Sequence, residues 1–100
     1  MSHIQHLING QHVSRGQTFE TINPATQEVL ANVAAGGADE VNAAVAAAIA
    51  AFPKWANTPA PERAKLMRKL GDLIAKHVPD IAQTETNDCG QTISQTGKQL

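Results

Sequence analysis

Aromatic residues and sulfur are scarce in this sequence. Its 100 residues include two phenylalanines, one tryptophan and no tyrosine, so the 42% of hydrophobic residues are mostly alanine, valine, isoleucine and leucine. The single cysteine excludes a disulfide within the chain and is typical of a reducing compartment. No apolar run approaches the ~20 residues that span a bilayer, and no signal peptide is visible at the start. We therefore expect a cytoplasmic protein without a membrane partner.

A strong charge of either sign is also missing. The formal net charge is -1, which argues against nucleic acid as a partner. Charged residues make up 17% of the chain, a composition typical of folded rather than disordered proteins. The length suits one small domain or a part of a larger one.

The first third of the chain predicts two pairs of β-strands. Residues 4–13 flank Asn9-Gly10, a dipeptide that tolerates positive φ at both turn positions of a hairpin.

Residues 18–22 and 29–33 predict the second pair of strands. Pro24 favours an extended conformation at Asn23, whose side chain can bond the backbone that follows it. We therefore expect a tight turn after residue 22.

Residues 38–52 predict the first of two amphipathic helices. We expect the Gly36-Gly37 pair before it to be a strand-to-helix turn, since no dinucleotide-binding GxGxxG pattern surrounds it. We expect Pro53 to end the helix, because proline lacks the N–H that a helix interior needs. The apolar stripe of this helix consists of Val41, Val45, Ile49 and Phe52.

The second amphipathic helix is predicted over residues 57–76, with Thr58 as its N-cap and Pro59 at its first helical position. Its basic residues form a solvated face. Because the loop before it is short, we expect an antiparallel pair in which the two stripes cover each other and Trp55 covers the corner. The second stripe consists of Leu66, Met67, Leu70, Leu73 and Ile74.

A third helix is predicted from Pro79 to Cys89, with Gly90 as its left-handed C-cap. Residues from Thr92 onward predict another helical segment. The chain stops at Leu100 without a cap or polar tail, from which we expect a truncated protein.

Spacing alone predicts neither a catalytic nor a cofactor-binding residue. Cys89 falls at a predicted helix C-terminus, where the helix dipole and the neighbouring Asp88 disfavour a thiolate nucleophile. The remaining candidates each lack a required partner or are better explained as solvated side chains: His3 with His6, Gly97 with Lys98, and Glu85 with Asp88.

Taken in order, several stretches resemble the N-terminal part of the NAD(P)-dependent aldehyde dehydrogenase superfamily. They cover essentially the whole chain: Ile8-Asn9-Gly10, Phe19-Glu20-Thr21-Ile22-Asn23-Pro24-Ala25-Thr26, Val29-Leu30-Ala31, residues 40–52, Trp55, Pro61-Glu62-Arg63 and Glu85-Thr86-Asn87-Asp88-Cys89-Gly90. Residues 53–57 and 66–74 carry a closer likeness to bacterial semialdehyde dehydrogenases of aromatic-compound degradation. Gln91 departs from the pattern, since many members have lysine there.

The resemblance implies an α/β fold in which N-terminal β-hairpins are followed by a layer of amphipathic helices. Residues 1–100 would be the incomplete N-terminal portion of a cofactor-binding domain. The intact relative would use NAD or NADP to oxidise an aldehyde to the carboxylic acid, through a thiohemiacetal, hydride transfer and thioester hydrolysis, and would form a homo-oligomer. Its catalytic cysteine, glutamate base, oxyanion-hole asparagine and dinucleotide turn would all lie beyond this chain, so the segment alone would be inactive.

One site implied by the resemblance falls within the chain. Similar enzymes hold a monovalent cation with backbone oxygens at the positions of Thr21 and Ile22 and the carboxylate at the position of Asp88, and oxygen ligands suit such a hard cation. Plain strand and helix-end roles for these residues are the alternative.

A self-contained helical interaction module without catalysis is the alternative function. Such a module would unfold cooperatively as a monomer, whereas a scaffold segment would be helical but loosely packed.

Overall fold

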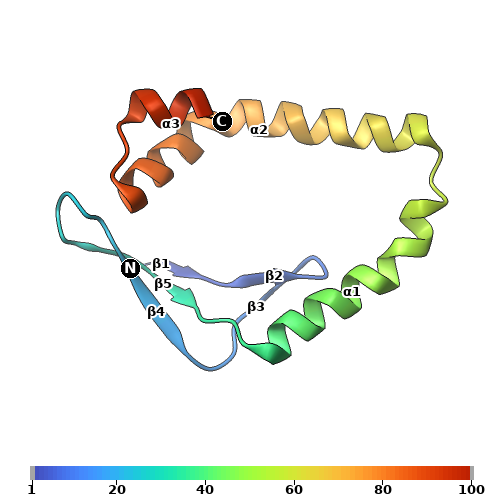
Figure 1. Ribbon diagram of the computed structural model, residues 1–100, viewed down its shortest axis with the longest axis horizontal. Helices are drawn as coiled ribbons and strands as arrows, with labels where there is room; N and C mark the ends of the chain where they lie inside the picture. The colour runs from blue at the N-terminus through green and yellow to red at the C-terminus, as the bar shows by residue number, and fades with distance from the viewer. Residues whose placement is uncertain (1, 100) are drawn as a thin grey trace. The chain divides into compact units, whose positions relative to one another are not determined.

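Within residues 2–99, which the computed structural model describes, five short strands precede three helices (Figure 1). These elements fall into two units. The first unit contains the residues up to 21 together with residues 31–58, and the second contains residues 22–30 together with those from 59 onward. In the described part of the chain, no helix is long and apolar enough to cross a membrane.

The Asn9-Gly10 hairpin is confirmed. Strands β2 (His6–Ile8) and β3 (Gln11–Val13) pair antiparallel, with His6 opposite Val13. Asn9 and Gly10 have φ values of 53° and 72°, the left-handed conformation that this turn requires at both positions.

A three-stranded sheet has the order β1-β5-β4, where β4 is Thr18–Ile22 and β5 is Val29–Ala34. The two strands predicted from the sequence are confirmed. The first strand, β1 (Ser2–Ile4), was not predicted: it pairs in parallel with β5, with Ser2 opposite Ala31. Because a parallel partner lies far along the sequence, no local turn signal announces it. The hairpin therefore begins at His6 and not at Ile4.

Helix α1 spans Ala38–Ala56, four residues beyond the predicted end at Phe52. The prediction that Pro53 ends the helix was wrong. Proline removes one donor but keeps its carbonyl, and the Asn57 N–H donates to the Pro53 carbonyl at 3.1 Å. One further turn of helix therefore follows Pro53.

Helix α1 lies beside β2 in the first unit, yet its apolar stripe is left uncovered. Ile49 is 67% exposed and Phe52 is 66% exposed. Among the described residues of α1, only Glu40 and Ala47 are shielded to an intermediate degree. The burial that the sequence analysis assigned to this stripe is therefore absent.

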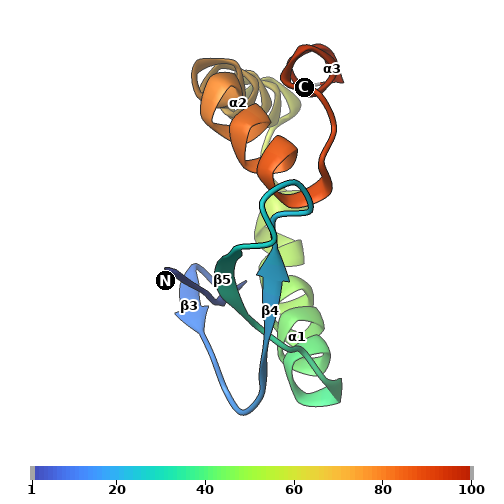
Figure 2. The same cartoon turned by 90° about the vertical axis from the view of Figure 1, so that its left-hand side faces the viewer.

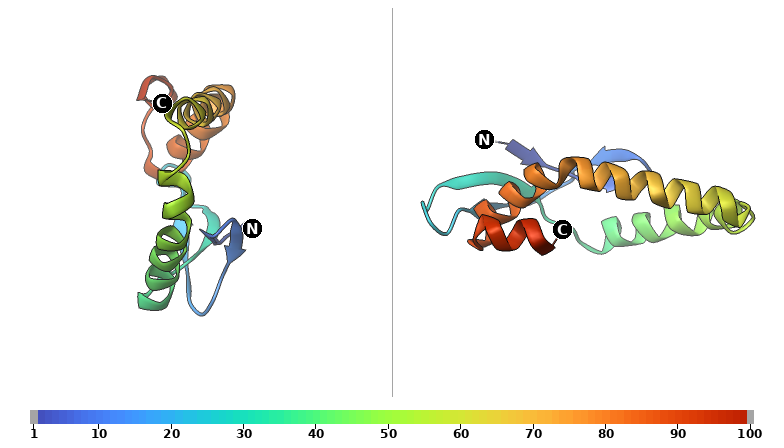
Figure 3. Two further views of the ribbon diagram at one scale, coloured as in Figure 1. Left: turned by 90° about the vertical axis from the view of Figure 1, so that its right-hand side faces the viewer. Right: turned by 90° about the horizontal axis from the view of Figure 1, so that it is seen from above.

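Helix α2 spans Ala60–Cys89 and is one helix of 30 residues, where the sequence predicted two (Figure 3). Pro79 lies inside it and cannot donate to the Ala75 carbonyl. The helix absorbs this loss by bending, as proline commonly causes, and Figure 1 shows the change of direction. The predicted break before Pro79 was wrong because one lost hydrogen bond does not outweigh a long helical sequence on both sides.

Thr58 is not the N-cap of α2, as was predicted from its position before Pro59. Its hydroxyl donates to the Lys54 carbonyl at 2.8 Å and so serves the C-terminal end of α1. Pro59 occupies the N-cap position of α2, with φ -55° and ψ 142°, and its carbonyl accepts the N–H groups of Glu62 and Arg63.

Gly90 ends α2 as the predicted left-handed cap, with φ +80° and an N–H that donates to the Thr86 carbonyl at 3.0 Å. Helix α3 (Ile93–Gln99) then turns back along the end of α2 (Figure 2). Thr96 is 1% exposed, and its hydroxyl lies 3.0 Å from the Thr86 hydroxyl. A hydroxyl pair thus joins the two helices.

The buried residues of both units are small. They are Ala31 and Ala34 on β5 and, in the second unit, Ala82 and Thr96. The large aliphatic side chains of the stripe on α2 stay between 40% and 59% exposed. The described part of the chain therefore has secondary structure but little hydrophobic core.

Candidate functional site

The three predicted cation ligands lie at the ends of two elements. Thr21 and Ile22 close β4, and Asp88 lies in the last turn of α2. Thr21 is shielded to an intermediate degree, while Ile22 and Asp88 are exposed. Ile22 and Asp88 belong to the same unit, and Thr21 belongs to the other.

The turn after Ile22 is rigidly bonded. The Asn23 side-chain oxygen accepts the N–H groups of Ala25, at 2.9 Å, and Thr26, at 3.3 Å, as the sequence predicted. The Asn23 N–H donates to the Glu28 carbonyl at 2.9 Å, which closes the loop across its base. These bonds fix the direction of the chain as it leaves Ile22.

The same turn lies against the C-terminal end of α2. A Cβ built on Gly90 would be 3.0 Å from Cγ of Pro24, so any larger residue would require Pro24 to move by a few tenths of an ångström. Gly90 follows Asp88 by two residues, and Pro24 follows Ile22 by two residues. Within the second unit, the close approach thus brings the segment after Ile22 to the end of the helix that carries Asp88.

Thr21 and Ile22 offer backbone carbonyl oxygens, and Asp88 offers a carboxylate. Within residues 2–99, no three His, Cys, Asp or Glu side chains gather into a metal-binding group. A carbonyl oxygen combined with a single carboxylate suits a hard cation of low charge better than zinc or another transition metal, which prefer nitrogen and sulfur ligands.

Cys89 is a free, exposed thiol at the last residue of α2, where the sequence placed it. Of the other residues weighed in the sequence, Glu85 and Asp88 lie three residues apart on α2, while the histidines and Gly97 do not form the motifs considered for them. His3 and His6 lie on different strands, and His3 Nε2 is 3.1 Å from the Ser14 hydroxyl. Gly97 lies inside α3 and not in a phosphate-binding loop.

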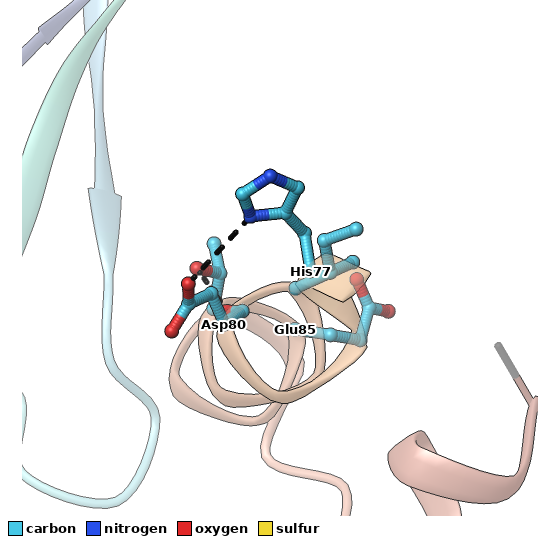
Figure 4. A pocket seen from close by; sticks show the side chains of 5 residues that line it. His77, Asp80 and Glu85 are labelled. Carbon is cyan, nitrogen blue, oxygen red and sulfur yellow. Dashed lines mark hydrogen bonds and ion pairs between the residues drawn. The ribbon is translucent and has the colours of Figure 1, made fainter. Parts of the chain in front are cut away.

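A shallow hollow on the surface of α2 was missed by the sequence analysis (Figure 4). Its lining comes from one helix: His77, Asp80, Ile81, Thr84 and Glu85. His77 Nδ1 is 4.0 Å from Asp80 Oδ2, and both side chains are largely exposed. The Thr84 hydroxyl donates to the Asp80 carbonyl at 3.0 Å. The lining residues are three or four positions apart, and this helical spacing could have revealed the hollow from the sequence. Because one helix lines the hollow on one side only, its side chains stay in contact with water.

Glu40 is the acidic residue whose titration the fold changes most clearly. The Gly37 backbone N–H donates to Glu40 Oε2 at 2.8 Å, and this bond, followed by one from its own N–H, lowers the pKa of Glu40. The charges of His6 and Arg15 lower the pKa further. Glu40 thus caps the start of α1.

The model of the aldehyde dehydrogenase family matches residues 12–100. The 5-carboxymethyl-2-hydroxymuconate semialdehyde dehydrogenase of Escherichia coli is 58% identical over 96 residues, which cover 96% of this chain and 20% of that protein.

Two solved structures match the backbone closely. An aldehyde dehydrogenase from Bacillus cereus is 42% identical, with a TM-score of 0.91 over 97% of this chain and 21% of that chain. A Sinorhizobium meliloti 1021 protein, assigned as a methylmalonate-semialdehyde dehydrogenase and complexed with NAD, is 33% identical, with a TM-score of 0.90 over 98% of this chain and 20% of that chain. The α/β fold expected from the sequence is confirmed, and the chain spans about a fifth of the length of these relatives.

Proposed function

Since this chain belongs to the aldehyde dehydrogenase family, we propose that it serves as the N-terminal segment of an NAD(P)-dependent enzyme that oxidises a semialdehyde to the carboxylic acid. The observation that carries the proposal is the 58% identity, over nearly the whole chain, to a protein five times as long that is named for a semialdehyde. That name also supports a substrate from the degradation of an aromatic compound, and we further propose a homo-oligomer.

The segment itself would contribute scaffold and not chemistry. In the reaction, aldehyde, water and NAD(P)⁺ give the acid, NAD(P)H and a proton. This requires a nucleophile, a base and a nicotinamide site. Cys89 is exposed at the end of a helix, Glu40 caps the start of α1, and Asp80 is a largely exposed partner of His77. We therefore expect no aldehyde oxidation by the 100-residue chain alone.

We propose that the backbone oxygens of Thr21 and Ile22 and the carboxylate of Asp88 bind a monovalent cation in the whole enzyme. The contact of Pro24 with Gly90 supports this, because it draws the segment after Ile22 to the end of α2. Replacement of Asp88 by Asn would keep the shape and remove the charge. The proposal would fail if K⁺ or Na⁺ altered the heat stability of the whole enzyme equally with Asp and with Asn at this position.

The function is best tested in a chimaera. Residues 1–100 replace the matching fifth of the Escherichia coli semialdehyde dehydrogenase, and formation of NADH or NADPH is followed with 5-carboxymethyl-2-hydroxymuconate semialdehyde. We expect the chimaera to keep activity within about tenfold of the parent, because the backbone that it inserts matches solved relatives with TM-scores of 0.90 and above.

Two controls accompany this assay. The 100-residue chain alone should give no NADH or NADPH, and the parent without its matching segment should also be inactive. A chimaera that folds and binds NAD but oxidises no aldehyde would contradict the proposed function. A chain that alone unfolds sharply as a monomer would favour the interaction module instead.

A further inference from the structure

The turn of the β2–β3 hairpin presents Asn9 and Gly10 at the surface. Both residues are exposed. Among the described residues, none besides the chain neighbours of Gly10 comes within 4 Å of a Cβ built on it. Because glycine has no side chain, its backbone nitrogen is accessible to the side-chain amide of the asparagine before it. The turn therefore carries both reacting groups of an intramolecular reaction.

We propose that Asn9 is a site of spontaneous deamidation, and that the closed hairpin holds it back from reaction. The Gly10 nitrogen attacks Cγ of Asn9 and forms a C–N bond, while the side-chain nitrogen of Asn9 leaves as ammonia with the proton that Gly10 gives up. The product is a five-membered succinimide ring. Water then opens the ring at one of its two carbonyls and gives aspartate or isoaspartate. The sequence consumes one water and requires no oxidant, reductant or cofactor.

Two of the other asparagines are followed by a nitrogen that is poorly suited to attack. Asn23 precedes Pro24, whose nitrogen carries no proton to give up. Asn57 precedes Thr58, and the Thr58 N–H donates to the Trp55 carbonyl at 3.1 Å. Neither position therefore offers the free, unhindered N–H of a glycine.

The remaining three asparagines lie in regular secondary structure. Asn42 is inside α1 and Asn87 is inside α2, so the nitrogen after each belongs to the helical hydrogen bonds. Asn32 is in β5 and precedes Val33, whose branched side chain crowds its own backbone nitrogen. Asn9 is consequently the asparagine at which we expect the reaction first.

The closed turn keeps the Gly10 nitrogen away from Cγ of Asn9. The φ values of 53° and 72° are those of a type I′ turn, in which ψ at the first position is about 30°. At this ψ the following nitrogen lies on the side of the Cα–C bond roughly opposite Cβ. Ring closure needs the nitrogen and Cβ on the same side, so the Cα–C bond of Asn9 must rotate and the turn must open before the reaction.

Of the two products, isoaspartate changes the fold. Its main chain runs through the former side chain and is one carbon longer, so a two-residue turn no longer joins Ile8 to Gln11 in the observed register. Strands β2 and β3 have three residues each, and β2 lies beside α1. Loss of the register therefore loosens the pairing of β2 and its contact with α1. Aspartate keeps the chain length, and an Asp-Gly pair suits the same turn.

The test incubates the full chain at neutral pH with and without urea. Peptide mass spectrometry follows the conversion of each asparagine to the acid, and isoaspartate is identified by methylation with an isoaspartyl methyltransferase. Val13→Pro removes a backbone N–H from the strand residue opposite His6 and so weakens the hairpin without touching the turn. Val13→Thr keeps a β-branched residue in the strand and is the matched control. Asn9→Gly keeps a suitable turn and removes the reacting side chain.

We expect Asn9 to react before the other asparagines, at a rate that urea raises at least about tenfold, because reaction requires local opening. Val13→Pro should raise the rate in the absence of urea at least about fivefold, and Val13→Thr should stay within about twofold of the wild type. Asn9→Gly should abolish the modification of this peptide. Equal rates with and without urea would overturn the proposal. So would a first reaction at another asparagine, or equal rates in Val13→Pro and Val13→Thr.

Discussion

Replacement of Gly90 by alanine tests the corner between the 23–27 turn and the end of α2. Gly90 has φ +80°, a conformation that costs an L-residue with a Cβ about 1–2 kcal/mol. The new Cβ would also lie 3.0 Å from Cγ of Pro24, so the turn must shift. We expect the last turn of α2 to lose at least about 1–2 kcal/mol of local stability, which corresponds to a factor of roughly 5–30 in the opening equilibrium.

Gly71→Ala is the matched control in the same helix. Gly71 has nothing within 4 Å of the position of an added Cβ, so alanine should stabilise the helix there by about 0.5–1 kcal/mol. The assay is amide hydrogen exchange on the full chain. The Gly90→Ala variant should exchange the amides of the last turn of α2 about 5–30 times faster, and Gly71→Ala should slow exchange around residue 71. Unchanged exchange near residue 90, together with the expected slowing near residue 71, would refute the account of this corner.

Three further substitutions test the remaining contacts. Because the fold lowers the pKa of Glu40, its stabilisation of α1 is present above the ordinary glutamate pKa of about 4.3 and is lost as pH falls through the lower folded value. Acid should therefore reduce helix content by circular dichroism less in Glu40→Gln than in the wild type. Thr58→Ser should keep the hydrogen bond to the Lys54 carbonyl. Thr58→Asp has a good N-cap side chain but no donor, so it should lose about 0.5–1.5 kcal/mol of helix stability. If Thr58→Asp melted at a higher temperature than Thr58→Ser, Thr58 would be an N-cap after all. Thr96→Val should release α3 by about 1–3 kcal/mol, and adding Thr86→Val should recover part of the loss in hydrogen exchange of α3.

Local chemistry made much of the fold predictable. Asn9-Gly10 and Gly90 were identified because few residues adopt positive φ at low cost, and the structure has both features. Asn23 was identified because its side chain can bond the backbone two residues ahead, which it does. Each of these depends on one residue and its immediate neighbours.

The wrong predictions concern helix boundaries, a helix cap and a strand partner, where residues further along the chain outweigh a local rule. Local rules predict helix boundaries at Pro53 and Pro79, but one missing N–H is a small loss within a long helix. Thr58 precedes Pro59 as an N-cap would, but its hydroxyl donates in the other direction. The parallel partner of β1 lies far along the chain, so no local rule predicts it.

The candidate cation site also combines a feature that local sequence predicts with one that depends on distant residues. Asp88 was placed correctly at the end of a helix from the capping glycine that follows it. The contact between Pro24 and Gly90 joins residues 66 positions apart, and neither has a sequence signal for the other. The cation itself stays a prediction based on family resemblance.

The hydroxyl pair of Thr86 and Thr96 is a link between α2 and α3 that does not depend on ionisation. Neither hydroxyl gains or loses a proton in the range where carboxylates and imidazoles titrate, and a bond between neutral groups is little affected by salt. Acid that weakens the Glu40 cap on α1 therefore leaves the joint between α2 and α3 intact. The chain should consequently lose its order in stages as pH falls, with α3 retained on α2 after the first turn of α1 has frayed.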